Sequence, residues 1–122
     1  MFELLPQSEA SVYGFKIIGK LTLEDEKTMI HLLNDGITAY GKVRLLINMN
    51  EFTGSSPAVL WEDLKWMTSH ITAVERLAIV VDSDALAWMI RQDARIAKYV
   101  GVEEKHFKSV DIDAAWDWLV TD

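Results

Sequence analysis

The sequence predicts a single α/β domain over residues 1–122, with a mixed, mostly parallel β-sheet and four helices in the order ββαβαβαβα. Short apolar runs alternate with longer segments of helical periodicity, which is the pattern of βαβ units. Residues 43–47 and 77–81 are nearly continuous runs of branched apolar side chains, as expected of central strands covered on both faces. A length of 122 residues suits one domain and leaves no room for a second.

The first two strands and the first helix carry clear local signals. Residues 12–19 have strand character, and we expect them to pair antiparallel with residues 2–5. Thr22 stands three residues before Asp25, as in the cap of a helix with an acidic first turn. Gly41 is placed to end that helix. The opening hairpin supplies the antiparallel part of the predicted sheet.

A polar segment, residues 48–57, separates the strand at 43–47 from a Trp-rich helix. We expect an elbow here, where the strand ends and the second helix begins at Pro57, because proline loses no hydrogen bond at the first helical position. The residues expected to form the core stripe of this helix are Leu60, Leu64, Met67 and Ile71. Trp66 falls about 135° from the centre of that stripe at 100° per residue, so we expect it to point outward.

The last third of the chain adds one strand and two helices. Asp82 and Asp84 precede a predicted third helix over residues 85–100. An edge strand is expected over residues 106–110, and Asp111 is expected to cap the closing helix.

Composition limits the classes of function. A formal charge of −7 argues against nucleic-acid binding, which needs a dense basic face. There are no cysteines, and no apolar run approaches the roughly 18 residues of a membrane span. The start has no basic region of the kind that precedes a secretory signal. We therefore expect a cytoplasmic protein whose membrane contact, if it has one, is peripheral at the inner face of the membrane.

Catalytic constellations are missing from the sequence. The three histidines have no metal-ligand spacing, and the six glycines do not cluster into a phosphate loop. The Ser55 and Ser56 pair lacks the flanking pattern of a nucleophile elbow. We expect no catalytic residue, no metal and no cofactor, and hence a protein that is not an enzyme.

Ser55 and Ser56 have two interpretations. Either hydroxyl suits the N-cap of the second helix, a role worth about 1 kcal/mol. The alternative is a phosphorylation switch, since a phosphate adds about two negative charges that the helix dipole tolerates at an N-terminus. Ser55 and Ser56 are thus the candidate phospho-acceptors.

An apolar ligand site is predicted between the second and third helices. Trp66 lies off the expected core stripe, and Asp93 falls within an apolar arc of the third helix, where a carboxylate is costly unless it is paired or wet. Structural alternatives are a Trp66 folded over its own helix and an Asp93 bonded to a nearby backbone group or lysine. The candidate ligand-binding residues are Leu60, Leu64, Trp66, Met67, Leu86, Met89, Ile90 and Asp93.

The opposite face of the third helix is basic and aromatic on an otherwise acidic protein. Anionic lipid headgroups attract such a face, and aromatic rings settle at the membrane interface. A solvated face with a local cation–π pair is the structural alternative. The candidate membrane-contact residues are Trp88, Arg91, Arg95 and Lys98.

Four separated segments resemble the bacterial SpoIIAA-like family in order and spacing: residues 19–25, 41–47, 61–66 and 114–119. The resemblance covers nearly the whole chain. It implies the STAS-type fold of anti-sigma-factor antagonists, and an architecture similar to the CRAL-TRIO lipid-binding domain, in which the second and third helices part to admit an apolar molecule.

The resemblance also bears on the polar elbow. In phosphorylated antagonists an Asp-x-Ser element and then an Asp-Ser pair follow this strand, and the serine of the pair takes the phosphate. Here Asn48 to Asn50 and Thr53 to Ser56 stand at those places, and both aspartates are absent. Ser55 or Ser56 therefore matches the phosphoserine position only loosely.

The leading hypothesis is a non-enzymatic binding domain for an apolar or amphipathic, lipid-like ligand, with peripheral membrane association and a homodimeric state. The alternative is a STAS-type regulatory domain that binds a regulatory protein partner and is switched by phosphorylation at Ser55 or Ser56.

Overall fold

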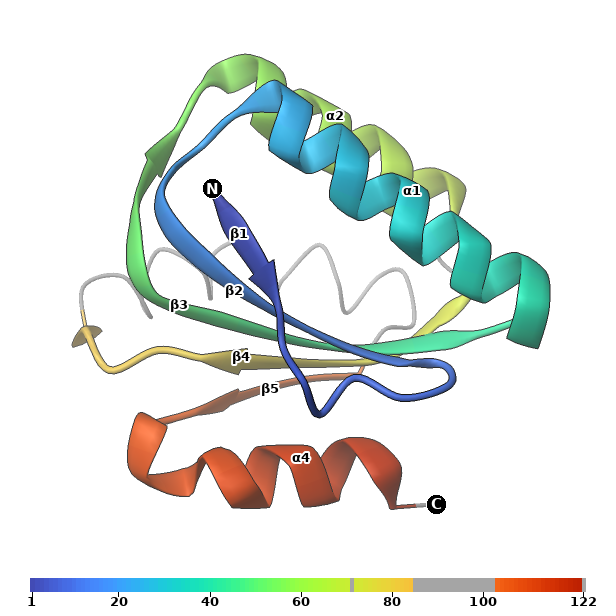
Figure 1. Cartoon of the computed structure of the whole chain (residues 1–122), viewed down its shortest axis with the longest axis vertical. Coiled ribbons are helices and arrows are strands. Elements are labelled where there is room, and N and C mark those ends of the chain that lie inside the picture. The colour runs from blue at the N-terminus through green and yellow to red at the C-terminus, as the bar shows by residue number, and fades with distance from the viewer. Residues whose placement is uncertain (71, 85–102, 122) are drawn as a thin grey trace.

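The computed structural model describes residues 1–70, 72–84 and 103–121 (Figure 1). They form a mixed five-stranded sheet in the order β1-β2-β3-β4-β5, in which β1 is antiparallel to β2 and the other neighbours are parallel. The strands are β1 (Phe2–Leu4), β2 (Val12–Leu21), β3 (Val43–Ser55), β4 (Val74–Val80) and β5 (Glu103–Phe107).

Helices cover both faces of this sheet. The described helices are α1 (Leu23–Tyr40), α2 (Pro57–Ser69) and α4 (Ile112–Val120), the last preceded by a 3-10 turn, η1 (Ser109–Asp111). Figure 1 shows α1 and α2 side by side on one face, running in the same direction, with α4 on the other face. The described part of the chain thus holds three α-helices instead of the four predicted; the third predicted helix, over 85–100, lies outside the described residues.

The local signals of the first helix are confirmed. Thr22 and Asp25 form a capping box, in which the Thr22 side chain accepts from the Asp25 N–H (3.1 Å) and the Asp25 carboxylate accepts from the Thr22 N–H (3.3 Å). Gly41 follows the helix with φ of 84°, a conformation that suits glycine, and its N–H donates to the Ile37 carbonyl. The hairpin of β1 and β2 is also confirmed, with Phe2 opposite Ile17.

The predicted polar elbow is wrong. Instead of ending near residue 47, β3 continues as a strand to Ser55, which pairs with Leu21 at the end of β2. Pairing of β3 with β4 ends at Asn48, so the rest of β3 is bonded along one edge only. A strand in that position is largely solvated, which is why its residues are polar although the segment is extended.

Two other boundaries differ from the prediction. The last strand is Glu103–Phe107 and begins three residues earlier than expected. Its first residues are charged, which suits the edge of the described sheet, and Glu103 lies 3.4 Å from Arg76 of the neighbouring strand. Asp111 occupies the cap position of α4, but its side chain makes no capping hydrogen bond; the turn η1 leads into the helix instead.

Alternate residues of the central strands enter two separate cores. Beneath α1 and α2 the buried side chains include Leu45, Leu77 and Ile79, together with Val59 and Trp66 of α2. On the other face Leu46, Ala78 and Val80 pack with Ala115 and Leu119 of α4. This period of two is what the continuous apolar runs of β3 and β4 predicted.

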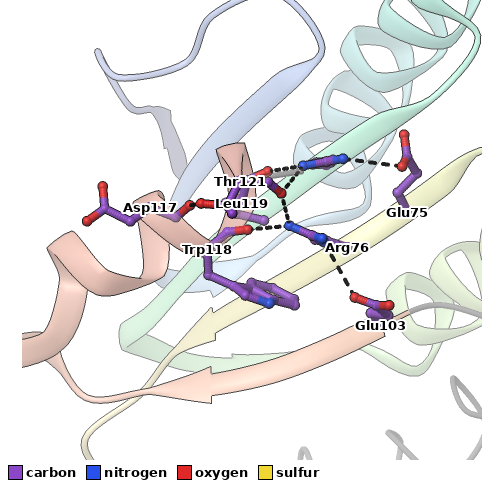
Figure 2. A network of polar contacts seen from close by, with 8 residues as sticks. Glu75, Arg76, Glu103, Asp117, Trp118, Leu119 and Thr121 are labelled. Carbon is purple, nitrogen blue, oxygen red and sulfur yellow. Dashed lines mark hydrogen bonds and ion pairs between the residues drawn. The ribbon is translucent and has the colours of Figure 1, made fainter.

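The end of α4 is tied to the sheet by arginines. Figure 2 shows Arg76 pointing toward the Trp118 and Thr121 main chain, with Glu103 on its other side. Arg44 donates to the Leu119 carbonyl at 2.6 Å and to the Thr121 carbonyl at 3.1 Å. These bonds satisfy carbonyl groups that the last turn of a helix leaves free.

Candidate functional site

The start of α2 is defined by Ser56 and Pro57. Ser56 is the N-cap, with its side chain accepting from the Val59 N–H at 3.4 Å, and Pro57 occupies the first helical turn. The capping role is therefore confirmed for Ser56. Ser55 is the last residue of β3 and caps nothing.

The orientation of α2 about its axis is opposite to the predicted one. Trp66, expected to point outward, is 7% exposed and lies in the core with Val59. Leu60 is 60% exposed and Leu64 39%, although both were assigned to the core stripe. The helix is oriented so that the Trp66 indole and Val59, seven residues earlier, are both removed from water, while the equally large indole of Trp61 stays outside.

Trp66 also joins α2 to α1. Its Nε1 donates to Asn34 Oδ1 at 2.8 Å, and its ring stacks on that of His70 with 4.8 Å between centroids. A buried indole N–H is stabilised by a hydrogen-bond partner, which α1 supplies here. Trp66 is thus a packing residue of the helix layer.

The side of α2 opposite Trp66 is apolar and exposed. We name it the outer face of α2 and define it as Pro57, Leu60, Trp61 and Leu64, neighbours at helical spacing over the first two turns. Trp61 is 60% exposed. Single exposed apolar residues are common, whereas a contiguous exposed apolar group is a candidate contact surface.

Sequence reasoning did not assign Trp61 to a site. The two tryptophans of α2 are five residues apart and so lie on different sides of the helix, and only one of them can enter the core. The sequence does carry one signal. It contains two alternative apolar stripes on α2, one through Val59 and Trp66 and the other through Leu60 and Leu64, and whichever stripe is not buried forms an exposed apolar face.

A buried acid lies where α1 meets α2. Glu26 of α1 is 4% exposed, and its carboxyl group hydrogen-bonds that of Asp63 on α2. Burial first, and then the negative charges of Asp63 and Glu62, raise the pKa of Glu26 to about 9. Glu26 therefore holds its proton at neutral pH.

A polar cluster joins β3 to the segments that follow β4 and β5. The Asp82 carboxylate accepts from the Ser109 N–H (2.8 Å) and from Ser109 Oγ (2.6 Å), while Asn50 donates to Ser109 Oγ (2.6 Å) and accepts from the Asp82 N–H (2.7 Å). Lys108 Nζ donates to the Asp82 carbonyl at 2.9 Å. Hydrogen bonds from Ser109 lower the pKa of Asp82. The members of this cluster satisfy one another, so its evident role is to hold the segments that follow β4 and β5 against β3.

The predicted ligand-binding residues do not converge on one face of α2. Leu60 and Leu64 lie on its outer face, Trp66 is buried, and Met67 is half-buried against the core. A surface hollow does exist in the described residues, but it runs along α1, where it is lined by Leu23, Glu24, Lys27, Thr28 and His31.

The remaining predicted site residues lie outside the described residues. They are the ligand-binding candidates Leu86, Met89, Ile90 and Asp93 and the membrane-contact candidates Trp88, Arg91, Arg95 and Lys98. Within residues 1–70, 72–84 and 103–121, no three His, Asp or Glu side chains are grouped to hold a metal ion. In the same part of the chain no helix is both long and apolar enough to span a bilayer.

Comparison with known proteins gives a family. The family model described as SpoIIAA-like matches residues 12–120. A search of curated proteins gives no match.

Two solved structures are similar to the chain along its length. One is an uncharacterised protein of the DUF3478 family from Shewanella loihica PV-4, described as having a SpoIIAA-like fold; it is 29% identical, with a TM-score of 0.74, and the match covers 98% of this chain and 92% of that one. The other is the anti-sigma factor antagonist SpoIIAA in its unphosphorylated form, 8% identical with a TM-score of 0.60, covering 96% and 98% of the two chains.

These matches support the SpoIIAA-like part of the predicted fold and give no support to the CRAL-TRIO-like part. None of the three descriptions mentions a lipid, a membrane or a dimer. The family model spans most of the chain, and the two solved structures have a similar fold. The chain belongs to the SpoIIAA-like family.

Proposed function

We propose that the protein is a regulatory protein-interaction domain that binds a partner protein through the outer face of α2 and is switched at Ser56. The observation that carries the proposal is the exposed apolar surface of Pro57, Leu60, Trp61 and Leu64, which begins beside the capping serine. The similar fold of SpoIIAA, an anti-sigma factor antagonist, supports a regulatory role.

The outer face has the properties of a binding hot spot. Trp61 presents a large, rigid ring on a regular helix, so little conformational entropy is lost when it is buried by a partner. Leu60 and Leu64 flank it one turn apart and would exclude water from the contact. A helix presented in this way fits a protein partner that offers an apolar groove.

Ser56 lies where a charge would alter this surface. Its hydroxyl caps α2 and is only partly buried, and Pro57 of the outer face follows it directly. A phosphate on Ser56 is tolerated by the positive end of the helix dipole, so the helix persists. About two negative charges then stand at the edge of an apolar contact, which weakens docking through the cost of removing them from water.

The first experiment identifies the partner by placing a photo-reactive amino acid at position 61 in cells and then measures binding of the purified pair. We expect Trp61→Gln to weaken the Kd by at least about tenfold, as for a central hot-spot residue. Tyr40→Gln is the matched control, because Tyr40 is 57% exposed at the far end of α1. Equal affinity of the Trp61 variant and the unaltered protein would overturn the proposal.

The second experiment tests the switch. Ser56→Asp should weaken binding while the circular dichroism of the helices is retained, since aspartate is also a good N-cap. Ser55→Asp places the same charge at the end of β3 and should have a smaller effect. If the two substitutions weaken binding equally, Ser56 has no special role.

If sedimentation shows that Trp61→Gln dissociates a dimer and no other protein is cross-linked, the occupant is a second copy and the regulatory proposal fails.

A further inference from the structure

Glu26 stands out among the described residues because it is the one polar side chain in the buried core. It lies on the inner side of α1 in line with Met29, Leu33 and Gly36, which are buried as well. An apolar residue in this position would be expected to pack without cost. Replacement of buried ionic groups by apolar ones is often neutral or stabilising, so the acid is not explained by stability alone.

Among the described residues, the charged groups that act on Glu26 are acidic. From α2 these are Asp63, which is hydrogen-bonded to Glu26, and Glu62, whose charge acts on it. Lys65 is the nearby cation of α2, and it lies 3.0 Å from Glu62. From the sheet, the core beneath α1 and α2 consists of apolar side chains. Two carboxyl groups in this setting adopt their hydrogen bond only when one of them carries a proton.

We propose that Glu26 and Asp63 form a proton-operated latch between α1 and α2. With one proton shared between them, the two carboxyl groups bond across the helix pair and α2 is held against α1. When the proton leaves, the Glu26 carboxylate, which is shielded from water, faces the like charge of the exposed Asp63 at short range, and α2 separates from α1. The latch would exist whether or not α2 is the docking surface of the proposed function.

A second contact shows where the separation begins. Further along the helix pair the Trp66 Nε1 bond to Asn34 holds the other end of α2 against α1. The Glu26 and Asp63 contact lies nearer the N-terminal ends of both helices, and that end of α2 carries Ser56 and Trp61. Loss of the proton therefore frees the end of α2 that bears the outer face first.

The direction of the pH effect follows from the pKa of Glu26. It is raised from the ordinary value of 4.5 to about 9, so between these values the closed state holds a proton that the open state releases. The closed state is favoured most at and below about pH 4.5. Between about pH 4.5 and 9, the ratio of closed to open molecules falls by about tenfold for each pH unit.

Hydrogen exchange of the intact chain tests the latch. After correction for intrinsic exchange rates, we expect the opening of α2 amides to increase at least tenfold between pH 6 and pH 8.5. The amides of α4, on the other face of the sheet, should change much less. Parallel increases in α2 and α4 would show global unfolding instead of a latch and would overturn the proposal.

Glu26→Gln supplies the decisive variant, because an amide donates permanently to the Asp63 carboxylate and cannot ionise. It should remove the increase in α2 opening, whereas Glu24→Gln, an exposed neighbour on α1, should retain it. An unchanged pH response in Glu26→Gln contradicts the latch. Should that variant not fold, carbon NMR of the unaltered protein decides the matter: a Glu26 carboxyl group that titrates below pH 6 rules the latch out.

Discussion

Trp66 Nε1 lies 2.8 Å from Asn34 Oδ1, and this hydrogen bond joins two helices whose partner residues are 32 positions apart in the sequence. The bond accompanies an orientation of α2 in which Trp66, and not the equally large Trp61, lies in the core. As a result Leu60, Trp61 and Leu64 are left on the outside of the molecule. One buried contact thus creates the surface on which the proposed function depends.

Replacement of Trp66 should be costly, and replacement of Trp61 should not. Trp66→Phe leaves Asn34 without its donor and removes part of the buried ring, so we expect the free energy of unfolding to fall by about 2–4 kcal/mol. Trp61→Phe, on the exposed side of the same helix, should change it by less than about 0.5 kcal/mol. Urea denaturation of the two variants gives the comparison. Equal losses would mean that α2 is oriented differently from the structure.

Gly14 should not accept a side chain. A Cβ atom at this position would lie 2.4 Å from Trp116 Cη2 and 2.8 Å from Cζ2, inside any permitted contact distance. Gly14→Ala should therefore lower the free energy of unfolding by about 1–3 kcal/mol, the usual cost of overpacking. Calorimetry or urea denaturation measures it. Adding Trp116→Phe to the Gly14→Ala variant replaces the opposing ring with a smaller one and should restore part of the lost free energy of unfolding. If it restores none, the Trp116 ring is not what the new methyl group clashes with.

Arg76 should be needed to hold the end of α4. Its Nη1 donates to the Trp118 carbonyl at 2.5 Å and also to the Thr121 carbonyl, and its guanidinium lies 5.3 Å from the centre of the Trp118 ring. Arg76→Met removes these bonds, and we expect a loss of about 1–3 kcal/mol together with faster hydrogen exchange in α4.

Lys105 offers a matched control for Arg76. Its ammonium lies 5.4 Å from the same Trp118 ring, but among the described contacts it binds no α4 carbonyl. Lys105→Met should therefore cost less than about 1 kcal/mol. A Lys105 effect as large as that of Arg76 would assign the stabilisation to the aromatic contact and not to the carbonyl bonds.

Asp82 should contribute to stability at neutral pH but not in acid. Hydrogen bonds from Ser109 lower the pKa of Asp82 below its ordinary value of 3.8. The stability that Asp82 contributes is therefore present above about pH 3.8 and is lost as the pH falls through the lower, folded value. Asp82→Asn should be less stable than the unaltered protein at pH 7 and approach it near pH 3.

The measurement for Asp82 is urea denaturation at pH 7, 5 and 3. Asp84→Asn is the control, because the Asp84 side chain is almost fully exposed and its described partner is Lys108 alone. It should show little difference at any pH. The free energy of unfolding of Asp82→Asn should approach that of the unaltered protein in acid. If the difference between them stays the same at pH 3, Ser109 does not stabilise the charge of the Asp82 carboxylate.

Much of the fold could be predicted because its signals are local. The capping box of Thr22 and Asp25 lies within four residues, Gly41 ends α1 where the chain requires a positive φ, and Pro57 begins α2. The apolar runs of β3 and β4 likewise indicate burial on both faces wherever the strands are placed.

The candidate site could be predicted only in part. Ser56 was among the expected residues because a cap is recognised from its neighbours. Trp61 was not, since the sequence does not say which of two apolar stripes on α2 enters the core. Glu26 was not, because it looks like an ordinary member of the acidic first turn of α1. The length of β3 was missed for a similar reason: the polarity of Asn48 to Ser55 reflects the loss of a neighbouring strand, which is a property of the sheet.

The sequence by itself thus determined the class of fold, the hairpin, the caps of α1 and α2 and the central strands, since these depend on dihedral preferences and periodicity within a few residues. Only the tertiary structure decided which face of α2 is buried, that Glu26 meets Asp63, and that arginines of β3 and β4 bind the end of α4. Such contacts join residues far apart in the chain. Which residues become partners depends on how whole helices and strands pack against one another, and a local sequence pattern does not contain that information.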